Sequence, residues 1–186
     1  MASTNFPNLS GPLVNLRRLS ANDAQHIVRL MSYNISKNLY EVPYPYTIED
    51  AVNFIRSSDK DFELLRAIHF AIDYKGHESG NNCQKLVGAI GLKNIDLVNK
   101  TANIGYWIGE KYWGKGIATE CVRLVIEYGF SELKLEEVSA YVYPENKSSM
   151  RILEKNGLKK NGEMNEYHSM SRTNRTSLKY VIQKNK

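Results

Sequence analysis

The chain has 186 residues, of which 42% are hydrophobic and 24% are charged. This length suits one domain that buries a substantial core without disulfides or metal, and the hydrophobic content excludes a disordered chain. Lysine and arginine exceed the acidic residues by 25 − 20 = +5 without a dense basic block, so the charge favours anionic ligands only weakly.

Sequence signatures of several protein classes are absent. The two cysteines, Cys83 and Cys121, and the four histidines are scattered and show no metal-site spacing. There is no basic stripe with interleaved aromatic residues, no long apolar stretch, and no signal-peptide pattern in the opening MASTNFPNLSG. We therefore expect a cytoplasmic protein, a monomer or homodimer, that binds no metal, nucleic acid or membrane.

The first quarter of the chain predicts a strand and a helix after a flexible N-terminus over residues 1–12. Residues 14–19, VNLRRL, alternate in hydrophobicity as a strand does. Ser20 and Asp23 have the spacing of a capping box, and apolar residues recur at helical intervals behind them as far as Met31.

A loop and a second helix follow. Residues 38–47 contain two prolines and cannot continue the first helix, so we predict a rigid, tyrosine-rich loop. Thr47 and Asp50 repeat the capping-box spacing and open a helix with an apolar face.

The middle of the chain predicts three strands, at residues 68–74, 85–95 and 101–109. The first two flank the polar segment 75–84, whose glycine, asparagine and serine content is typical of an exposed hairpin loop. His69 and His77 lie in this region without a positioned partner for acid–base chemistry, so neither is expected to be catalytic.

The last third alternates helices and strands. Apolar residues at helical spacing predict a helix from 117 to about 133, and Cys121 lies on its apolar face, which indicates a core role. A strand at 136–144, a helix at 146–156 that ends at Gly157, and a last strand at 177–183 follow, with a further strand possible near 159–163. The order indicates one α+β, or mixed α/β, domain over residues 1–186, with a mainly antiparallel sheet of six to seven strands and about four helices.

The glycine turn YWGKGIATE points to a ligand. Gly114 and Gly116 flank Lys115 directly before a helix, where unpaired N–H groups and the helix dipole favour an anion such as phosphate. The turn is not a P-loop, because Gly116 stands where Ser or Thr is needed, and not a dinucleotide fingerprint, because Thr119 replaces the third glycine. A pattern this short also occurs in ordinary loops.

Two longer stretches carry a family resemblance. IGYWIGEKYWGKGIATECVRLVIEYGF and VSAYVYPENKSSMRILEKNGLKKNGE resemble the GNAT superfamily of acyl-CoA N-acetyltransferases, and within it the RimJ/RimL-type branch. The match is close over residues 85–163, and LRRLSANDAQHIVRLM and PYTIEDAVNFI resemble the opening of that branch. One departure is Trp113, which occupies the position of the Arg or Gln in the family's pyrophosphate loop.

The resemblance implies a GNAT-like domain whose sheet splays between its fourth and fifth strands, with acetyl-CoA as the acetyl donor. The pyrophosphate would lie on the N–H groups of the glycine turn, and the pantetheine arm would lie beside the strand before it. The cofactor-binding residues implied in this way are Trp107, Ile108, Trp113, Gly114, Lys115, Gly116, Ile117, Ala118, Thr119 and Asn146.

Acetyl transfer to an amine also requires a proton for the departing sulfur and a base for the amine. The family's pattern implies Ser149 for the sulfur, and Tyr143 is the alternative. Glu41, Glu110 and Glu145 are candidates for the base, and a water chain that ends on a backbone carbonyl is an equal alternative.

The acceptor is expected to be a primary amine, because relatives in this family acetylate protein N-termini, polyamines and other small amines. We expect Tyr44, Tyr46 and Tyr106 to contact it, although prolines and tyrosines that pack over the core would give the same loop pattern. A non-catalytic acyl-CoA sensor is the alternative function, and a nucleic-acid-binding module is a more distant one.

Overall fold

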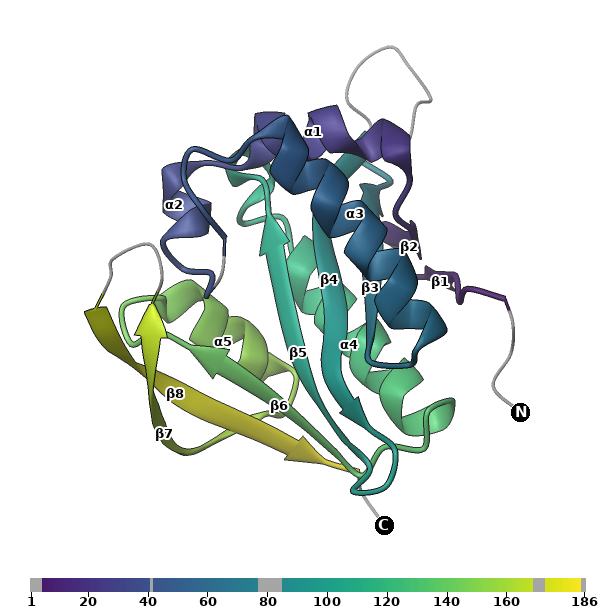
Figure 1. Ribbon diagram of the computed structural model, residues 1–186. Coiled ribbons are helices and arrows are strands. Elements are labelled where there is room, and N and C mark those ends of the chain that lie inside the picture. The colour runs from purple at the N-terminus through teal and green to yellow at the C-terminus, as the bar shows by residue number, and fades with distance from the viewer. Residues whose placement is uncertain (1–4, 41, 77–84, 169–172, 185–186) are drawn as a thin grey trace.

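The computed structural model describes residues 5–40, 42–76, 85–168 and 173–184. Within these residues the chain forms one sheet of eight strands in the order β1-β2-β3-β4-β5-β6-β8-β7 (Figure 1). The strands are β1 (Leu9–Ser10), β2 (Val14–Arg18), β3 (Ala67–Tyr74), β4 (Lys85–Asp96), β5 (Thr101–Ile108), β6 (Glu137–Val142), β7 (Lys159–His168) and β8 (Thr173–Gln183). The helices are α1 (Ala24–Leu30), α2 (Tyr33–Ser36), α3 (Ile48–Glu63), α4 (Ile117–Ser131) and α5 (Lys147–Lys155), with short 3-10 turns η1 (Ala21–Asp23) and η2 (Glu110–Tyr112).

The sheet is antiparallel except between β5 and β6, and this parallel pair forms a V. Only Thr101–Asn103 of β5 pair with Glu137–Ser139 of β6, and the two strands then diverge toward their carboxyl ends (Figure 1). β4 stays paired with β5 up to Ile108, and the whole of β6 is paired with Leu178–Gln183 of β8. The splay predicted between the fourth and fifth strands is therefore confirmed, at β5 and β6.

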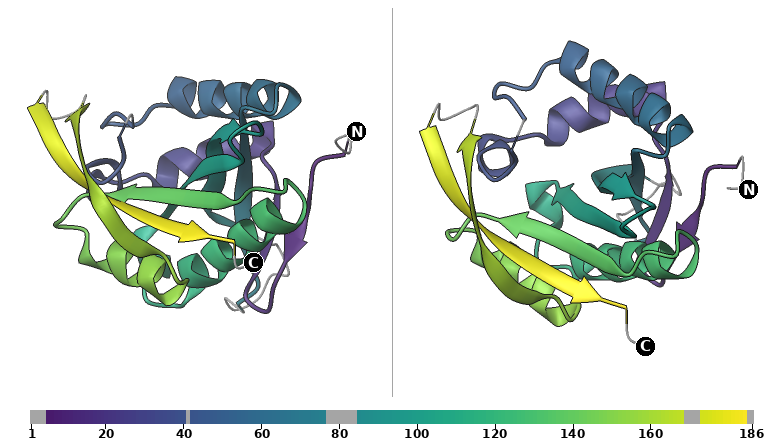
Figure 2. Two further views of the ribbon diagram at one scale, coloured as in Figure 1. Left: turned by 90° about the horizontal axis from the view of Figure 1, so that it is seen from below. Right: turned by 60° about the horizontal axis from the view of Figure 1, so that its bottom comes forward.

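Helices cover both faces of the sheet (Figure 2). α1 and α3 pack over β3 and β4 on one face, around a core cluster that includes Ile27 and Ile55. α4 and α5 pack on the other face around the larger core, to which α4 contributes a buried stripe at helical spacing: Ile117, Cys121, Val122, Val125 and Ile126. Burial raises the pKa of the Cys121 thiol, as expected for a core residue.

The capping signals in the sequence mark real helix starts. The Asp50 N–H donates to Thr47 Oγ1 at 3.2 Å, and the Thr47 N–H donates back to Asp50 Oδ2 at 2.8 Å. At the earlier box, the Ser20 N–H donates to Asp23 Oδ2 at 2.8 Å, and a 3-10 turn leads into α1. Both predicted helices therefore form. A side chain caps α3, whereas α1 continues from the 3-10 turn without a side-chain cap.

An ion cluster joins β2, β3 and η1. The Arg17 guanidinium donates to the Asp73 carboxylate at 2.7 Å and to the Asp23 carboxylate at 2.8 Å, and both carboxylates are buried. Burial alone would raise the pKa of Asp23, but hydrogen bonds from Arg17 and Ser20 hold it below its usual value. The cluster therefore adds to the main-chain pairing of β2 with β3, and removing one of its charges would leave the others buried and unpaired.

His69 is a structural residue of β3. Its ring meets the Phe54 ring edge-on, with the ring centres 5.3 Å apart. Burial, with a further contribution from the Lys93 charge, lowers the pKa of His69 to about 4, so the imidazole is neutral at pH 7. His77 lies outside the described residues.

The number of elements predicted from the sequence was too low. Among the described residues there are eight strands and five α-helices, where six to seven strands and about four helices were expected. Within the segment 1–12, which was expected to be flexible, Leu9–Ser10 pair with β2 and Phe6 packs against Phe62 and Phe70. No helix in the described part of the chain has the length and apolar character needed to cross a membrane.

Candidate functional site

The glycine turn leads directly into α4 and has the backbone shape that only glycine adopts easily. Gly114 has a φ of +76° and Gly116 a φ of +79°, and Gly116 is the N-cap residue of α4. An L-residue with a side chain is strained in this left-handed region, which explains both glycines. The turn is exposed on the surface, so a ligand can reach its main chain.

The turn presents unpaired N–H groups at the positive end of a helix dipole. The first main-chain hydrogen bond of α4 runs from the Glu120 N–H to the Gly116 carbonyl at 3.1 Å. The N–H groups of Ile117, Ala118 and Thr119 therefore have no carbonyl partner within the described residues. Together with the dipole of a 15-residue helix, they form a seat for an anion.

Lysine side chains add positive charge beside this turn. Lys115 Nζ lies 5.5 Å from the centre of the Tyr74 ring and 5.4 Å from that of Tyr112, and Lys111 Nζ lies 4.8 Å from the Tyr112 ring centre. These cation–π contacts hold both ammonium groups near the turn.

Trp113, at the position of the family's Arg or Gln, is held by the main chain. Its indole N–H donates to the Ile108 carbonyl at 2.7 Å, although the side chain is 50% exposed. The indole thus ties the end of β5 to the glycine turn, and it offers an anion no charge.

Alternate residues of β5 direct their main-chain N–H and carbonyl groups away from β4 and so form an open edge. Val87 and Gly109 form a hydrogen-bonded pair at 2.9 Å, so in this antiparallel ladder the main-chain groups of Trp107 also face β4. Those of Tyr106 and Ile108 face the opposite way, into the V where β6 has diverged. The Ile108 carbonyl accepts from Trp113. Among the described residues, the Ile108 N–H and both main-chain groups of Tyr106 have no strand partner and are open to an extended ligand.

Side chains alternate on β5 as well. Trp107 packs toward α1 and α3 in the second core cluster, whereas Tyr106 and Ile108 face the α4–α5 side. The family resemblance implied that both Trp107 and Ile108 lie beside the cofactor arm. In the structure the main-chain groups of Ile108 face the V, whereas those of Trp107 face β4.

Ser149 and Tyr106 meet at the opening of the V. Asn146 caps α5, because its Oδ1 accepts the Ser149 N–H at 3.1 Å. Ser149 Oγ, half-buried in the first turn of α5, lies 2.9 Å from the Tyr106 hydroxyl, and burial raises the pKa of Tyr106 to about 12. Tyr106 was predicted to contact the acceptor, and the structure pairs it with Ser149.

Tyr143 lies in a different environment. It is 3% exposed, and the Arg175 guanidinium stacks 3.5 Å above its ring centre. Arg175 also pairs with the Glu145 carboxylate and donates to the Lys37 carbonyl at 2.8 Å. Arg175 thereby joins β8, the corner before α5 and the end of α2, a role that sequence reasoning missed.

The candidate bases that the structure describes already hold partners. Glu110 accepts hydrogen bonds from the Ser32 hydroxyl and, at 3.3 Å, from the Asn34 amide. Glu145 is held by Arg175. Glu41 lies outside the described residues.

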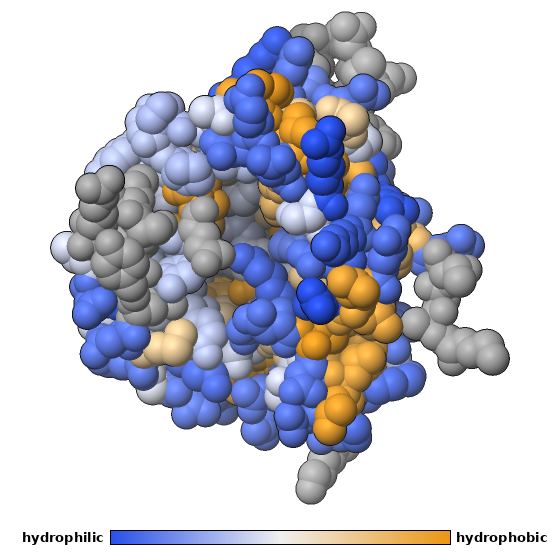
Figure 3. Space-filling model, in the orientation of Figure 1, coloured by the Kyte–Doolittle hydropathy of each residue, from blue (hydrophilic) through white to orange (hydrophobic). Residues whose placement is uncertain are grey.

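The predicted acceptor tyrosines of the 38–47 loop separate into two environments. Tyr44 is exposed and meets the exposed Tyr33 edge-on, with ring centres 5.6 Å apart. Tyr46 is half-buried against the second core cluster, and burial, with the nearby charge of Asp50, raises its pKa to about 12. In the space-filling view, the surface is hollowed between the α2 side and the β7–β8 side of the molecule (Figure 3).

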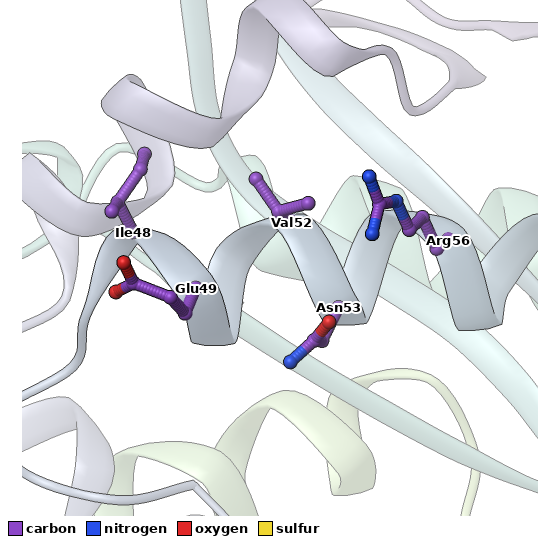
Figure 4. Close-up of a pocket in the computed structure, with 5 residues that line it drawn as sticks. All are labelled: Ile48, Glu49, Val52, Asn53 and Arg56. Carbon is purple, nitrogen blue, oxygen red and sulfur yellow. The ribbon is translucent and has the colours of Figure 1, made fainter.

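Another depression lies on α3 and involves none of these residues. It has a volume of about 230 Å³ and is lined by Ile48, Glu49, Val52, Asn53 and Arg56 (Figure 4). Within the described residues, no group of three or more His, Cys, Asp or Glu side chains is arranged to hold a metal ion.

Comparison with known proteins gives consistent matches. The family model described as "Acetyltransferase (GNAT) domain" matches residues 14–159. The probable N-acetyltransferase YjcK of Bacillus subtilis is 35% identical over 161 residues, which cover 83% of this chain and 84% of that protein. The putative ribosomal N-acetyltransferase YdaF of the same species is 30% identical over 154 residues, which cover 81% and 80%.

A solved structure extends this similarity. The microcin C7 self-immunity acetyltransferase MccE, solved in complex with acetyl-CoA and AMP, superposes with a TM-score of 0.80 at 25% identity, covering 94% of each chain. These matches together confirm the expected GNAT family and fold, and the similarity to YdaF agrees with the expected likeness to ribosomal N-acetyltransferases.

Proposed function

Because this chain belongs to the acetyltransferase (GNAT) domain family and is an N-acetyltransferase that uses acetyl-CoA, we propose that its glycine turn holds the donor and that Ser149 assists the departing sulfur. The donor supplies an acetyl group activated as a thioester. The contribution of the chain is to bind this donor, to orient it, and to manage protons around it.

The donor phosphates are proposed to lie on the turn from Trp113 to Thr119. The support for this is the pair of left-handed glycines, the unpaired N–H groups at the start of α4, and the Lys115 charge. Because Trp113 has no guanidinium, main-chain donors carry more of the affinity here than in relatives with Arg at this position. The left-handed, exposed N-terminus of α4 is the single observation that carries the proposal.

The pantetheine arm is proposed to run along the open edge of β5. The Ile108 N–H and both main-chain groups of Tyr106 face the V, where they can pair with an extended chain as a strand would. Asn146 lies at the next corner and is proposed to contact the same arm. Its Oδ1 already serves as the α5 cap, so its amide nitrogen is the group available for this contact.

Ser149 is proposed as the hydrogen donor to the departing sulfur, and Tyr143 is the alternative. The Ser149 hydroxyl lies at the opening of the V beside the unpaired edge of β5. Tyr143 is covered by Arg175 and would need a rearrangement of that side chain to reach a ligand. The difference in access favours Ser149.

The proton of the amine is proposed to leave through water. Glu110 and Glu145 are each tied to other side chains, so neither is free to approach an amine without giving up a partner. A water chain that ends on a main-chain carbonyl needs no such rearrangement.

The acceptor is proposed to be a primary amine that enters through the hollow beside α2 and the 38–47 loop. Exposed Tyr33 and Tyr44 can hold an ammonium group over their rings, as Lys37 Nζ already does at 5.7 Å from the Tyr33 ring centre. The candidates are a protein N-terminus, for which the name of YdaF offers a precedent, and a small polyamine.

An acetyl-CoA assay with matched acceptors tests this proposal. We expect release of CoA with at least one member of a panel of peptides with free N-termini, spermidine and spermine, and no release with the same peptides blocked by N-acetylation. Binding of acetyl-CoA without transfer to any member would support the sensor alternative. Transfer to the blocked peptides would contradict the proposed acceptor class.

A further inference from the structure

The hydroxyl groups of Tyr106 and Ser149 form a pair that links the open strand to the capped helix. Tyr106 lies on β5 at the point where β6 has diverged, and Ser149 lies in the first turn of α5. Their oxygens are 2.9 Å apart, which is within the normal range of an O–H···O hydrogen bond. Ser149 is also fixed through its main chain, because its N–H donates to Asn146 Oδ1.

The direction of this hydrogen bond follows from the acceptors that Tyr106 can reach. Within the described residues these are Ser149 Oγ at 2.9 Å and the Ser149 carbonyl at 3.5 Å, and the second is too long for a proper bond. A mostly buried tyrosine hydroxyl rarely leaves its hydrogen unused. Either hydroxyl could donate at this distance, and we infer from these acceptors that Tyr106 donates and Ser149 Oγ accepts.

The direction fixes where the hydrogen of Ser149 points. A serine hydroxyl has one hydrogen and two lone pairs, and one lone pair is occupied by Tyr106. The hydrogen must then point away from Tyr106 and is available to another acceptor. A serine without such a partner tends to turn its hydrogen back onto the carbonyl one helical turn earlier, where it is of no use to a ligand.

We propose that Tyr106 is a positioning residue that holds the Ser149 hydroxyl with its hydrogen directed at the sulfur of CoA. This rests on the proposed role of Ser149. No covalent step at Tyr106 is involved: as the bond between the acetyl carbon and sulfur breaks, the Ser149 hydrogen stabilises the thiolate, and Tyr106 keeps its own proton. This role toward the donor differs from the predicted contact of Tyr106 with the acceptor.

The test measures the thiol of bound CoA and needs no acceptor. A hydrogen bond from Ser149 favours the thiolate, so the thiol of enzyme-bound CoA should ionise at lower pH than the same thiol in the Ser149→Ala protein. Ultraviolet absorbance of the thiolate gives this pKa, and calorimetry of CoA binding shows whether each variant still holds CoA. We expect Ser149→Ala to raise the thiol pKa by about 1 unit, since a hydrogen bond to a charged group is worth about that much.

Tyr106→Phe keeps the ring and removes only the hydroxyl. We expect it to raise the thiol pKa by about half a unit or more in the CoA-bound protein, whose saturation calorimetry verifies, because Ser149 is then free to turn away. In the Ser149→Ala background the same substitution should have no further effect. Tyr180→Phe is the matched control, because Tyr180 also donates to α5, at 3.1 Å to Glu154, but does not touch Ser149.

Each other outcome contradicts a different statement. If the wild-type protein does not bind CoA, the proposed donor site is refuted. A thiol pKa that does not change in Ser149→Ala would refute the role of Ser149 and, with it, this inference. A shift in Ser149→Ala but none in Tyr106→Phe would overturn the inference alone, as would a Tyr106→Phe shift that persists without Ser149 or that Tyr180→Phe reproduces.

Discussion

Replacing Gly116 by valine tests whether the glycine turn is the donor site. Gly116 has a φ of +79°, and a Cβ built there meets only the end of the Leu13 side chain, at 3.6 Å. The substitution therefore has room, and its effect comes from the backbone, where a left-handed L-residue costs roughly 1–2 kcal/mol and a β-branched one more. Relaxing this strain would move the N–H groups of the turn away from one another. A change of 1–2 kcal/mol corresponds to about a 5- to 30-fold loss of affinity for acetyl-CoA.

Isothermal titration calorimetry with acetyl-CoA measures this loss, and Gly162→Val provides the control. Gly162 also has a positive φ, +105°, with no atom within 4 Å of a built Cβ, but it lies on β7, away from the turn. We expect both variants to unfold at lower urea concentration and only Gly116→Val to bind acetyl-CoA more weakly. Equal affinity of the wild type and Gly116→Val would refute the assignment of the turn as the donor site. If Gly162→Val weakened binding equally, the effect of Gly116→Val would be explained by a general loss of stability.

Three further substitutions test other parts of the structure. Trp113→Phe removes the indole donor to the Ile108 carbonyl and should lower the free energy of unfolding by about 1 kcal/mol, while the salt dependence of acetyl-CoA binding, measured by calorimetry, stays unchanged. Arg17→Met leaves two buried carboxylates without their cation and should lower the free energy of unfolding in urea at pH 7 by about 3 kcal/mol. The pKa of His69 is about 4 in the folded state and near 6.5 in the unfolded state, so the unfolded state binds more protons between these values. Stability should therefore fall by roughly 2–3 kcal/mol as the pH is lowered from 7 to 4, and His69→Gln should remove this part of the decrease.

The results that contradict these expectations are specific. An affinity loss in Trp113→Phe that grows at low salt would mean that Trp113 contributes to the electrostatic attraction between the site and acetyl-CoA. Unchanged stability of Arg17→Met would show that the Asp23 and Asp73 carboxylates become hydrated or protonated in the variant. An identical pH dependence of unfolding in wild type and His69→Gln would show that the imidazole takes up its proton at the same pH in the folded and unfolded states.

The sequence predicted those elements that have a regular period or a cap. The long helices and the central strands repeat apolar residues at 3.6 or 2 positions, and both capping boxes stand at real helix starts. The missed α2 and β1 are too short to show any period. β7 reads KKNGEMNEYH, which is polar because it is an edge strand, so hydrophobic alternation could not reveal its full length.

The candidate site could be predicted only where it is contiguous. The turn from Trp113 to Thr119 carries its own signal in two glycines before a helix. The pairing of Tyr106 with Ser149 joins residues 43 positions apart, and it depends on how far β6 diverges from β5. Arg175 lies further along the chain still, in a segment without a motif, and its stacking on Tyr143 follows from the register between β6 and β8.

Nuclear magnetic resonance of the main-chain amides during a titration with acetyl-CoA tests the central claim most directly. If the donor phosphates lie on the glycine turn and its arm on the open edge of β5, the largest downfield amide shifts should fall on Gly114 through Thr119, with a second group that includes Ile108. The main-chain amide of Trp107 faces β4 and serves as the control, so its signal should shift less than that of Ile108. Shifts concentrated elsewhere, for example around the α3 depression, with the amides of the turn unchanged, would contradict the account.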